Sequence, residues 1–286
     1  MMKQDKWLIE ISPSNRLLDL NLKQVWRYRD LLFLFVKRDV ITLYKQTILG
    51  PLWYLIQPLF TTVIFTLIFN NLAGIQTGGI PPFLFNLAGV TTWNYFKECL
   101  TATSDTFKKN EQIFGKVYFP RVIMPISIVI SNLLKFGIQF GIFIAFYIYY
   151  YFFSESSLTL SVNALAYPLV ILAMGLLGLG LGMIISSMVT KYRDLSFLVS
   201  FGVQLLMYIS AVVYPISLAK EKFPDFAWVI EYNPLAYLIE ITRYVLIGEG
   251  VVTSFGLIYI SSITLVVLIT GLLIFNKTEK SFIDTI

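Results

Sequence analysis

Long apolar segments separated by short polar ones make up most of the chain. A helix that crosses the hydrocarbon core of a bilayer needs about 20 predominantly apolar residues. Five segments are apolar over such a length, and a sixth is interrupted by Asn94, Lys97, Glu98 and Asp105. This interrupted segment is expected to begin with an irregular portion. The pattern predicts an all-helical, polytopic membrane protein with six transmembrane helices, at residues 52–72, 82–106, 122–153, 163–189, 195–214 and 253–275.

The segment before the first span is amphipathic. At helical spacing, one side of residues 22–44 is apolar and the opposite side carries most of the charges. Such a helix lies in the membrane interface instead of crossing the bilayer. Two roles have equal weight: a membrane-surface anchor, and a lever that also touches a cytoplasmic partner. Gly50 and Pro51 then break this helix and direct the chain into the first span. The apolar side consists of Val25, Leu32, Val36, Val40 and Leu43.

Residues 215–252, between the fifth and sixth spans, contain two short apolar stretches with charges. Neither stretch is long enough to cross a bilayer. Asn233 is placed to cap a helix that begins at Pro234 and runs to about Ile247, and Gly248 is placed to stop it. We therefore predict a re-entrant helical pair at the outer face, with a simple extracytoplasmic cap as the alternative.

The fourth span is rich in glycine. Gly178 and Gly182 have the four-residue spacing that lets two helix backbones approach closely, and Gly175 and Gly180 lie beside them. Small residues of this kind are common at helix interfaces in membranes. Helix packing is therefore favoured over a ligand site.

Composition and charge agree with a membrane protein. Apolar residues make up 57% of the chain and charged residues 14%, against about a quarter in ordinary globular domains. The net charge of +5 does not come from one basic patch. Nine Lys and Arg residues precede the first span, five lie in residues 97–121, and none lies in residues 71–81 or 154–162. Because cytoplasmic loops carry the excess of basic residues, both termini are predicted to be cytoplasmic.

The residue types that are missing exclude several kinds of chemistry. The chain has no histidine, which excludes histidine metal ligands and Ser-His catalytic pairs, and we predict neither a metal site nor a catalytic residue. The single cysteine, Cys99, cannot form an internal disulfide. No Gly-rich loop ends in Gly-Lys-Ser or Gly-Lys-Thr, so any ATP must be handled by another chain.

Several short motifs follow one another from about Arg29 to the end of the chain. They are RDV at 38–40, LYKQTILGPLWYLIQPLF at 43–60, AGVTTWNYF at 88–96, NEQIFGKVYFPR at 110–121, KYRDL at 191–195, SAVVYPIS at 210–217, YNPLAYLIEITRYVLIG at 232–248 and EKSF at 279–282. Each motif is weak alone. In series they resemble the permease subunits of polysaccharide-exporting ABC transporters, especially the O-antigen type, with teichoic acid and capsule exporters as relatives.

The resemblance implies a single ABC exporter transmembrane domain over residues 1–286, located in the bacterial inner membrane. It implies a homodimer bound to two copies of a separate ATPase subunit, which would carry ATP and Mg, while this chain holds no cofactor. The implied cargo is a lipid-linked polysaccharide. Such a cargo needs a polar path, because an unsatisfied polar group in hydrocarbon costs several kcal/mol.

The resemblance also implies two sites on the cytoplasmic side. The loop at 107–121 is the candidate coupling element that contacts the ATPase, with a plain interfacial turn as the alternative; its candidate residues are Asn110, Gln112, Ile113, Phe114, Lys116 and Tyr118. A cytoplasmic mouth for the pyrophosphate of the lipid carrier is expected near the end of the amphipathic helix. Attraction to anionic lipid heads explains the same basic residues with fewer assumptions. The candidates at the mouth are Lys37, Arg38, Lys45, Leu49 and Gly50.

Polar and aromatic residues on two spans are candidates for the channel wall. Polar residues on one stripe of a membrane helix should face away from lipid, and aromatic faces can lie against sugar rings. The candidates are Trp53, Tyr54, Gln57, Phe60, Thr61, Ser200, Gln204 and Tyr208. For any single aromatic residue, however, a lipid-facing or interfacial position is favoured. At the re-entrant pair the resemblance implies an outer gate, with Tyr214, Pro215, Asn233, Pro234, Glu240 and Arg243 as candidates.

Lys135 lies well inside the third span and matches no motif of the family. Because buried charges need partners, structural pairing within the bundle is favoured over substrate contact.

Three other functions remain open at this stage. An ABC exporter of teichoic acid, capsule or a small lipid or drug would share the layout. A membrane-embedded glycosyltransferase would need a nucleotide-sugar site with acidic metal ligands, and the sequence offers only scattered acids in loops. A passive channel would work without an ATPase.

Overall fold

The computed structural model describes residues 22–45, 50–117, 119–154, 158, 162–192 and 194–283. Within these ranges the chain forms helices joined by turns and contains no strand, which confirms the all-helical prediction there. Predicted site residues Leu49 and Tyr118 lie outside the described residues. The helical elements are α1 Leu22–Arg27, α2 Arg29–Lys45, η1 Gly50–Leu52, α3 Trp53–Phe65, η2 Thr66–Leu72, α4 Pro82–Ser104, α5 Thr106–Phe114, α6 Ile123–Phe153, η3 Val162–Ala166, α7 Tyr167–Lys191, α8 Leu195–Ile209, α9 Ile216–Lys222, α10 Ala227–Glu231, α11 Pro234–Ile247 and α12 Ser254–Ile283.

Four helical segments of the described chain are long and apolar enough to cross a membrane, by length and composition. α4 and α8, which the sequence predicts as the second and fifth spans, are not among the four. α4 has 23 residues but carries Lys97, Glu98 and several amides and hydroxyls, and α8 has 15 residues. The four segments are Trp53–Leu72, Ile123–Phe153, Val162–Lys191 and Ser254–Glu279.

α4 lies in the middle of the bundle and carries several polar side chains among its apolar ones, and it is buried along most of its length. Asn86 donates from Nδ2 to Asn70 Oδ1 at 2.7 Å, and the Thr92 and Tyr167 hydroxyls are 3.0 Å apart. These partners offset the cost of burying polar groups. The expectation of an irregular start was wrong, since α4 is continuous from Pro82. Proline fits the first turn of a helix, where no N–H is needed.

The glycines of α7 are packing positions, as the sequence predicts. A Cβ on Gly178 would lie 2.8 Å from Cys99 Cβ of α4, and a Cβ on Gly182 would lie 2.6 Å from Thr103 Cβ. On another side of α7, a Cβ on Gly180 would lie 2.9 Å from Val267 O of α12. Glycine therefore lets α7 approach both α4 and α12 closely.

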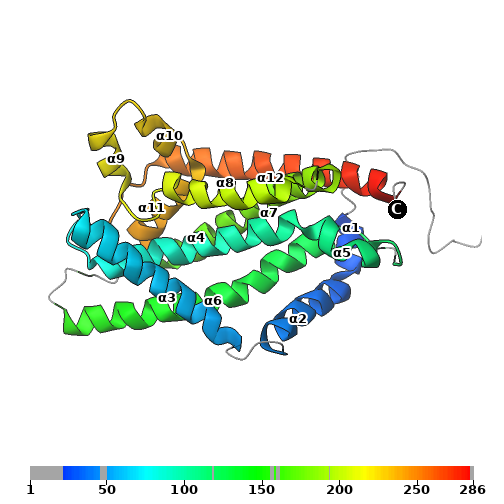
Figure 1. Cartoon of the computed structure of the whole chain (residues 1–286), viewed down its shortest axis with the longest axis horizontal. Helices are drawn as coiled ribbons and strands as arrows, with labels where there is room; N and C mark the ends of the chain where they lie inside the picture. The colour runs from blue at the N-terminus through cyan, green and yellow to red at the C-terminus, as the bar shows by residue number, and fades with distance from the viewer. Residues whose placement is uncertain are drawn as a thin grey trace, which may run out of the picture.

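The long helices run along one axis of the molecule, and the short ones gather at its ends (Figure 1). α9 and α10 lie at one end, whereas α1, α5 and the C-terminal part of α12 lie at the other. At this second end, phenylalanines from several elements pack together in a group that we call the aromatic cluster. It consists of Phe35, Phe107, Phe114, Phe119 and Phe275.

Candidate functional site

The predicted coupling loop forms the short helix α5, which is attached to the bundle on one side and open on the other. The backbone leaves helical geometry at Asn110, whose Nδ2 donates to Thr106 O at 2.9 Å. Phe114 is 5% exposed and packs in the aromatic cluster, and Ile113 is half-buried. Gln112 and Lys116 are exposed. These two side chains are therefore free of the bundle in this conformation.

Arg121 links this loop to the C-terminal helix α12 through hydrogen bonds. The sequence analysis did not identify this contact. Arg121 Nη1 donates to Glu279 O at 3.1 Å, and its Nη2 donates to Phe114 O at 3.4 Å. The guanidinium also lies over the Phe114 ring. Burial lowers the pKa of Arg121, and the Glu279 carboxylate opposes this change. The signal in the sequence is that both residues belong to the motif series, in NEQIFGKVYFPR and EKSF.

The amphipathic segment consists of α1 and α2, which are separated by a turn at Tyr28. Its most buried residue is Phe35, which the predicted stripe omitted, and Val25 and Leu32 of the stripe pack in the same cluster. Val36 and Val40 of the stripe are also half-buried. Phe35 is buried because it packs in the aromatic cluster against Phe119, with ring centroids 5.7 Å apart.

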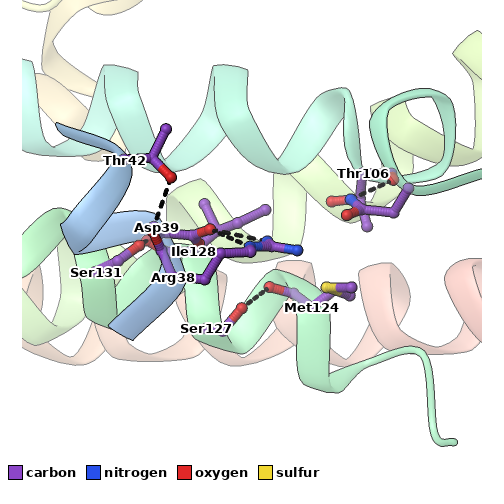
Figure 2. Close-up of polar contacts among 9 residues, drawn as sticks. Arg38, Asp39, Thr42, Thr106, Met124, Ser127, Ile128 and Ser131 are labelled. Atoms are coloured by element: carbon purple, nitrogen blue, oxygen red, sulfur yellow. Dashed lines mark hydrogen bonds and ion pairs between the residues drawn. The ribbon is translucent and has the colours of Figure 1, made fainter. Parts of the chain in front are cut away.

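The predicted residues of the cytoplasmic mouth lie on and after α2. Lys37 and Lys45 are exposed, and Gly50 is buried with a positive φ of 48°. Arg38 Nη2 lies 2.8 Å from Asp39 Oδ1. This pair lies against the turn of α6 that carries Ile128 and Ser131 (Figure 2).

A cavity of about 410 Å³, which we call the inner cavity, lies between α2, α4, α5 and α6. Most of its lining residues are of polar or charged types. The sequence analysis did not group them, because they come from four helices. The lining residues are Arg38, Asp39, Thr42, Ala102, Lys109, Asn110, Ile113, Ile128, Ser131, Asn132 and Lys135.

Lys135 is paired within the bundle, which confirms the favoured prediction for it. Its Nζ lies 3.1 Å from Glu98 Oε2 of α4 and 5.3 Å from the centroid of the Tyr54 ring of α3. One turn further along α6, Gln139 Oε1 accepts from Asn94 Nδ2 at 3.3 Å. Two of the residues that interrupt the second span, Asn94 and Glu98, thus face Gln139 and Lys135 of the third.

The predicted channel residues lie on faces of α3 and α8 that this chain leaves open. Trp53 is 53% exposed and Phe60 is 65% exposed, Gln57 is also exposed, and Tyr54 and Thr61 are half-buried. On α8, Ser200, Gln204 and Tyr208 are exposed. The two faces are open to lipid, to a second copy of the chain or to a channel.

The predicted cap of α11 is confirmed. Asn233 Oδ1 accepts from Leu235 N at 3.0 Å, α11 runs from Pro234 to Ile247, and Gly248 ends it with a φ of 78°. Asn233 also donates from Nδ2 to Ser210 Oγ at 3.1 Å. One residue therefore starts α11 and ties it to the end of α8.

Arg243 is the most enclosed of the predicted gate residues, at 1% exposed. Its Nη2 donates to Val212 O at 2.6 Å, and its Nη1 donates to Tyr214 O at 3.1 Å. The guanidinium lies 3.8 Å from the centroid of the Phe85 ring of α4. A Cβ on Gly89 would lie 2.5 Å from Val212 O, so glycine is needed for this close approach. Arg243 thus holds the segment after α8 against α4.

Glu240 and Pro215 line a second cavity of about 600 Å³ at this end, together with Arg243. Glu240 Oε2 is 3.8 Å from Arg243 Nη1, and this buried oxygen has no hydrogen bond within the described part of the chain. Tyr214 donates its hydroxyl to Tyr208 O at 2.6 Å. The six gate candidates therefore lie in one region, although Arg243 is enclosed by its own chain.

Several helices that are long and apolar enough to cross a membrane, packed along one axis, define a multi-pass membrane protein. Residues 30–247 match the family described as ABC-2 type transporter. The match spans most of the chain, and the chain belongs to this family.

The chain aligns with several similar proteins over nearly their whole length. The chain is 31% identical to the O-antigen export system permease protein RfbA of Klebsiella pneumoniae, over 89% of this chain and 94% of the relative. It is 22% identical to a protein of the same name from Myxococcus xanthus, over 93% of this chain and 98% of the relative. It is 23% identical to the polysialic acid transport protein KpsM of Escherichia coli, over 87% of this chain and 93% of the relative.

Proposed function

We propose that this chain is the channel-forming permease subunit of an ATP-driven exporter that moves a lipid-linked, O-antigen-like polysaccharide from the cytoplasm across the inner membrane. The observation that carries the proposal is the 31% identity to an O-antigen export permease over 94% of that protein. The sequence has no Walker A motif, which supports the binding of ATP and Mg by a separate ATPase subunit.

The proposed topology has six crossings with both termini in the cytoplasm. α4 and α8 lie along the same axis as the four candidate spans, and α1 lies at the same end as the C-terminal part of α12 (Figure 1). The basic residues are concentrated in the segments of that end, which supports a cytoplasmic location. The segment that contains α9, α10 and α11 would then be the re-entrant, gate-forming segment at the outer face.

The proposed unit is a homodimer with two ATPase subunits. Exposed aromatic and polar residues on α3 and α8, such as Phe60 and Gln204, would line the channel or the dimer interface. The exposed side of α5, with Gln112 and Lys116, would contact the ATPase. Movements of the ATPase would reach the bundle through the aromatic cluster and Arg121.

A capsule-like polymer is a second candidate cargo. The observation in its favour is the likeness to a polysialic acid transport protein over 93% of that relative, although at the lower identity of 23%.

Deleting the gene and analysing lipid-linked glycans in the cytoplasm and outside the inner membrane tests the proposal. Export by this chain predicts that finished glycan accumulates inside and that a plasmid copy restores export. The chemical class of the accumulated glycan distinguishes the two cargoes. Normal export without this chain would refute the proposal.

A further inference from the structure

The first candidate span ends in a π-helix. η2, Thr66–Leu72, continues α3 without a break, and the Ala73 N–H donates to Ile68 O, five residues back, at 2.9 Å. In an α-helix the acceptor lies four residues back. π-helices are rare and occur mostly as single turns, often at functional sites. A π turn inside a membrane span is thus a feature that its surroundings must stabilise.

The π turn keeps Asn70 on the buried side of the helix. Pro58 is buried on that side, and an α-helix would place Asn70 about a third of a turn away from it. A π turn holds more residues than an α turn, so it takes back part of this rotation. Asn70 consequently meets α4, where Asn86 Nδ2 donates to its Oδ1 at 2.7 Å.

Asn70 also binds the loop that follows the span. Its Nδ2 donates to Ile75 O at 2.8 Å. Asn86 itself is 0% exposed and also donates to Thr66 Oγ1 at 3.1 Å, so it binds two residues of the π turn. One chain of hydrogen bonds therefore runs from α4 through η2 to the loop at 73–81.

This loop forms a wall of the cavity of about 600 Å³ that Glu240 and Arg243 also line. The Glu249 carboxylate lies against the loop, since a Cβ on Gly78 would lie 2.5 Å from Glu249 Cδ. The turn from η2 into α4 lies at the same end of the molecule as α9 and α10 (Figure 1). The sequence analysis placed the outer gate in residues 215–252 and did not include this loop. The loop residues that line the cavity are Gly74, Gln76, Thr77 and Gly78.

A second wall of the same cavity is held by the residue next to Asn86. The centroid of the Phe85 ring lies 3.8 Å from the Arg243 guanidinium, which binds the segment after α8 through two backbone carbonyls. Pro215 and Ser217, which follow this segment, line the second wall. Two consecutive residues of α4 thus hold two walls of one cavity.

We propose that the loop at 73–81 is a second part of the outer gate and that Asn86 is its positioning residue. Because Phe85 and Asn86 are neighbours on one enclosed helix, a movement of α4 displaces both walls together and changes the width of the cavity. The gate role rests on the proposed export function, whereas the position of the loop is a property of the isolated chain. The simpler alternative is that Asn86 only keeps Asn70 away from lipid.

Thiol labelling of the purified full-length chain in detergent tests whether Asn86 holds the loop. Cys99→Ser removes the buried native thiol, and Thr77→Cys introduces one on the loop at a position that is 7% exposed. The rate of its reaction with a charged maleimide reports how often the loop leaves the cavity wall. Asn86→Leu removes the donor at similar volume. We expect labelling to become about tenfold faster, the factor for one lost hydrogen bond.

A second variant and a control separate a local effect from general loosening. Asn70→Leu breaks the same chain of hydrogen bonds from the side of η2 and should speed the labelling of Thr77→Cys to a similar extent. Ile216→Cys is the control, because Ile216 is 8% exposed and lies on α9, next to the second wall. Its labelling rate should not change in either variant. Equal acceleration at both cysteines shows general destabilisation, and an unchanged rate for Thr77→Cys shows that other contacts hold the loop; either result overturns the proposal.

Export in cells tests the gate role. Gly182→Ala is the matched control, because it disturbs the packing of α4 against α7 without touching the loop. With export normalised to the amount of folded chain in the membrane, Asn86→Leu should lower export several-fold more than Gly182→Ala. Equal export by the two variants refutes the gate role, even where labelling shows a displaced loop. If the parent chain exports nothing, the proposed function fails and the gate role with it, whereas labelling still decides whether Asn86 positions the loop.

Discussion

Replacing Arg243 with methionine should destabilise the protein more than any exposed substitution of the same kind. Methionine fills much of the same volume but leaves Val212 O and Tyr214 O without their donors at 2.6 and 3.1 Å. Hydrogen bonds from a charged donor contribute about 1.5–3 kcal/mol each, and a desolvated cation–π contact contributes about 2 kcal/mol.

The net loss of unfolding free energy is smaller than the sum of these contributions, because the variant no longer has to bury a cation. Loss of the cation also leaves the buried Glu240 carboxylate, 3.8 Å from Nη1, without its partner, and its Oε2 makes no hydrogen bond within the described residues. We therefore expect a net loss of about 3 kcal/mol in the free energy of unfolding. At about 2 °C per kcal/mol for a chain of this size, the melting temperature should fall by about 6 °C.

The assay is size-exclusion chromatography of the detergent-solubilised protein after heating, which gives an apparent melting temperature. Arg29→Met is the matched control, because Arg29 is exposed and its nearest carboxylate, Asp30, is 3.9 Å away. This control should melt within about 1 °C of the parent protein. If Arg243→Met melts as the control does, Arg243 does not hold the segment after α8, and our account of the outer end is wrong.

Two further substitutions test other contacts. Gly182→Ala places a Cβ 2.6 Å from Thr103 Cβ and should lower the free energy of unfolding by about 1–3 kcal/mol, measured by thermal unfolding. Gly137→Ala is the control, because the space around Gly137 is open, and it should be neutral or stabilising. Equal effects of the two substitutions would refute the packing role of Gly182. Arg121→Met should lower ATP-driven export several-fold while the chain still reaches the membrane, because the bonds to Glu279 O and Phe114 O are lost. Unchanged export would show that this link does not carry movement from α5.

Features that depend on neighbouring residues could be predicted from the sequence. α11 is the clearest case, because Asn233, Pro234 and Gly248 determine its first turn and its end through local backbone geometry. The glycines of α7 predicted close packing because a missing side chain allows approach whatever the partner is. In both cases the relevant physical cause lies within a few residues.

Features that depend on distant partners could not be predicted in the same way. The stripe chosen for residues 22–44 omitted Phe35, whose burial depends on Phe119, far along the chain. Arg121 was not singled out, because the role of an arginine before a span cannot be read until its neighbours are known. The inner cavity joins four helices, and no local pattern reports such a junction.

The polarity of α4 has one physical explanation that also bears on mechanism. Exposing Asn86, Thr92 and Glu98 to hydrocarbon would be costly, and these side chains instead bind α4 to η2, α7 and α6. The cavity lined by Glu240 and Arg243 touches α4 at Phe85, and the inner cavity touches it at Ala102, about 25 Å apart at 1.5 Å per residue. Because α4 is continuous between these points and enclosed along most of its length, it can tilt or shift only together with its neighbours. A movement of the helices around the inner cavity and a movement at Arg243 would therefore act on the same rigid element, from its opposite ends.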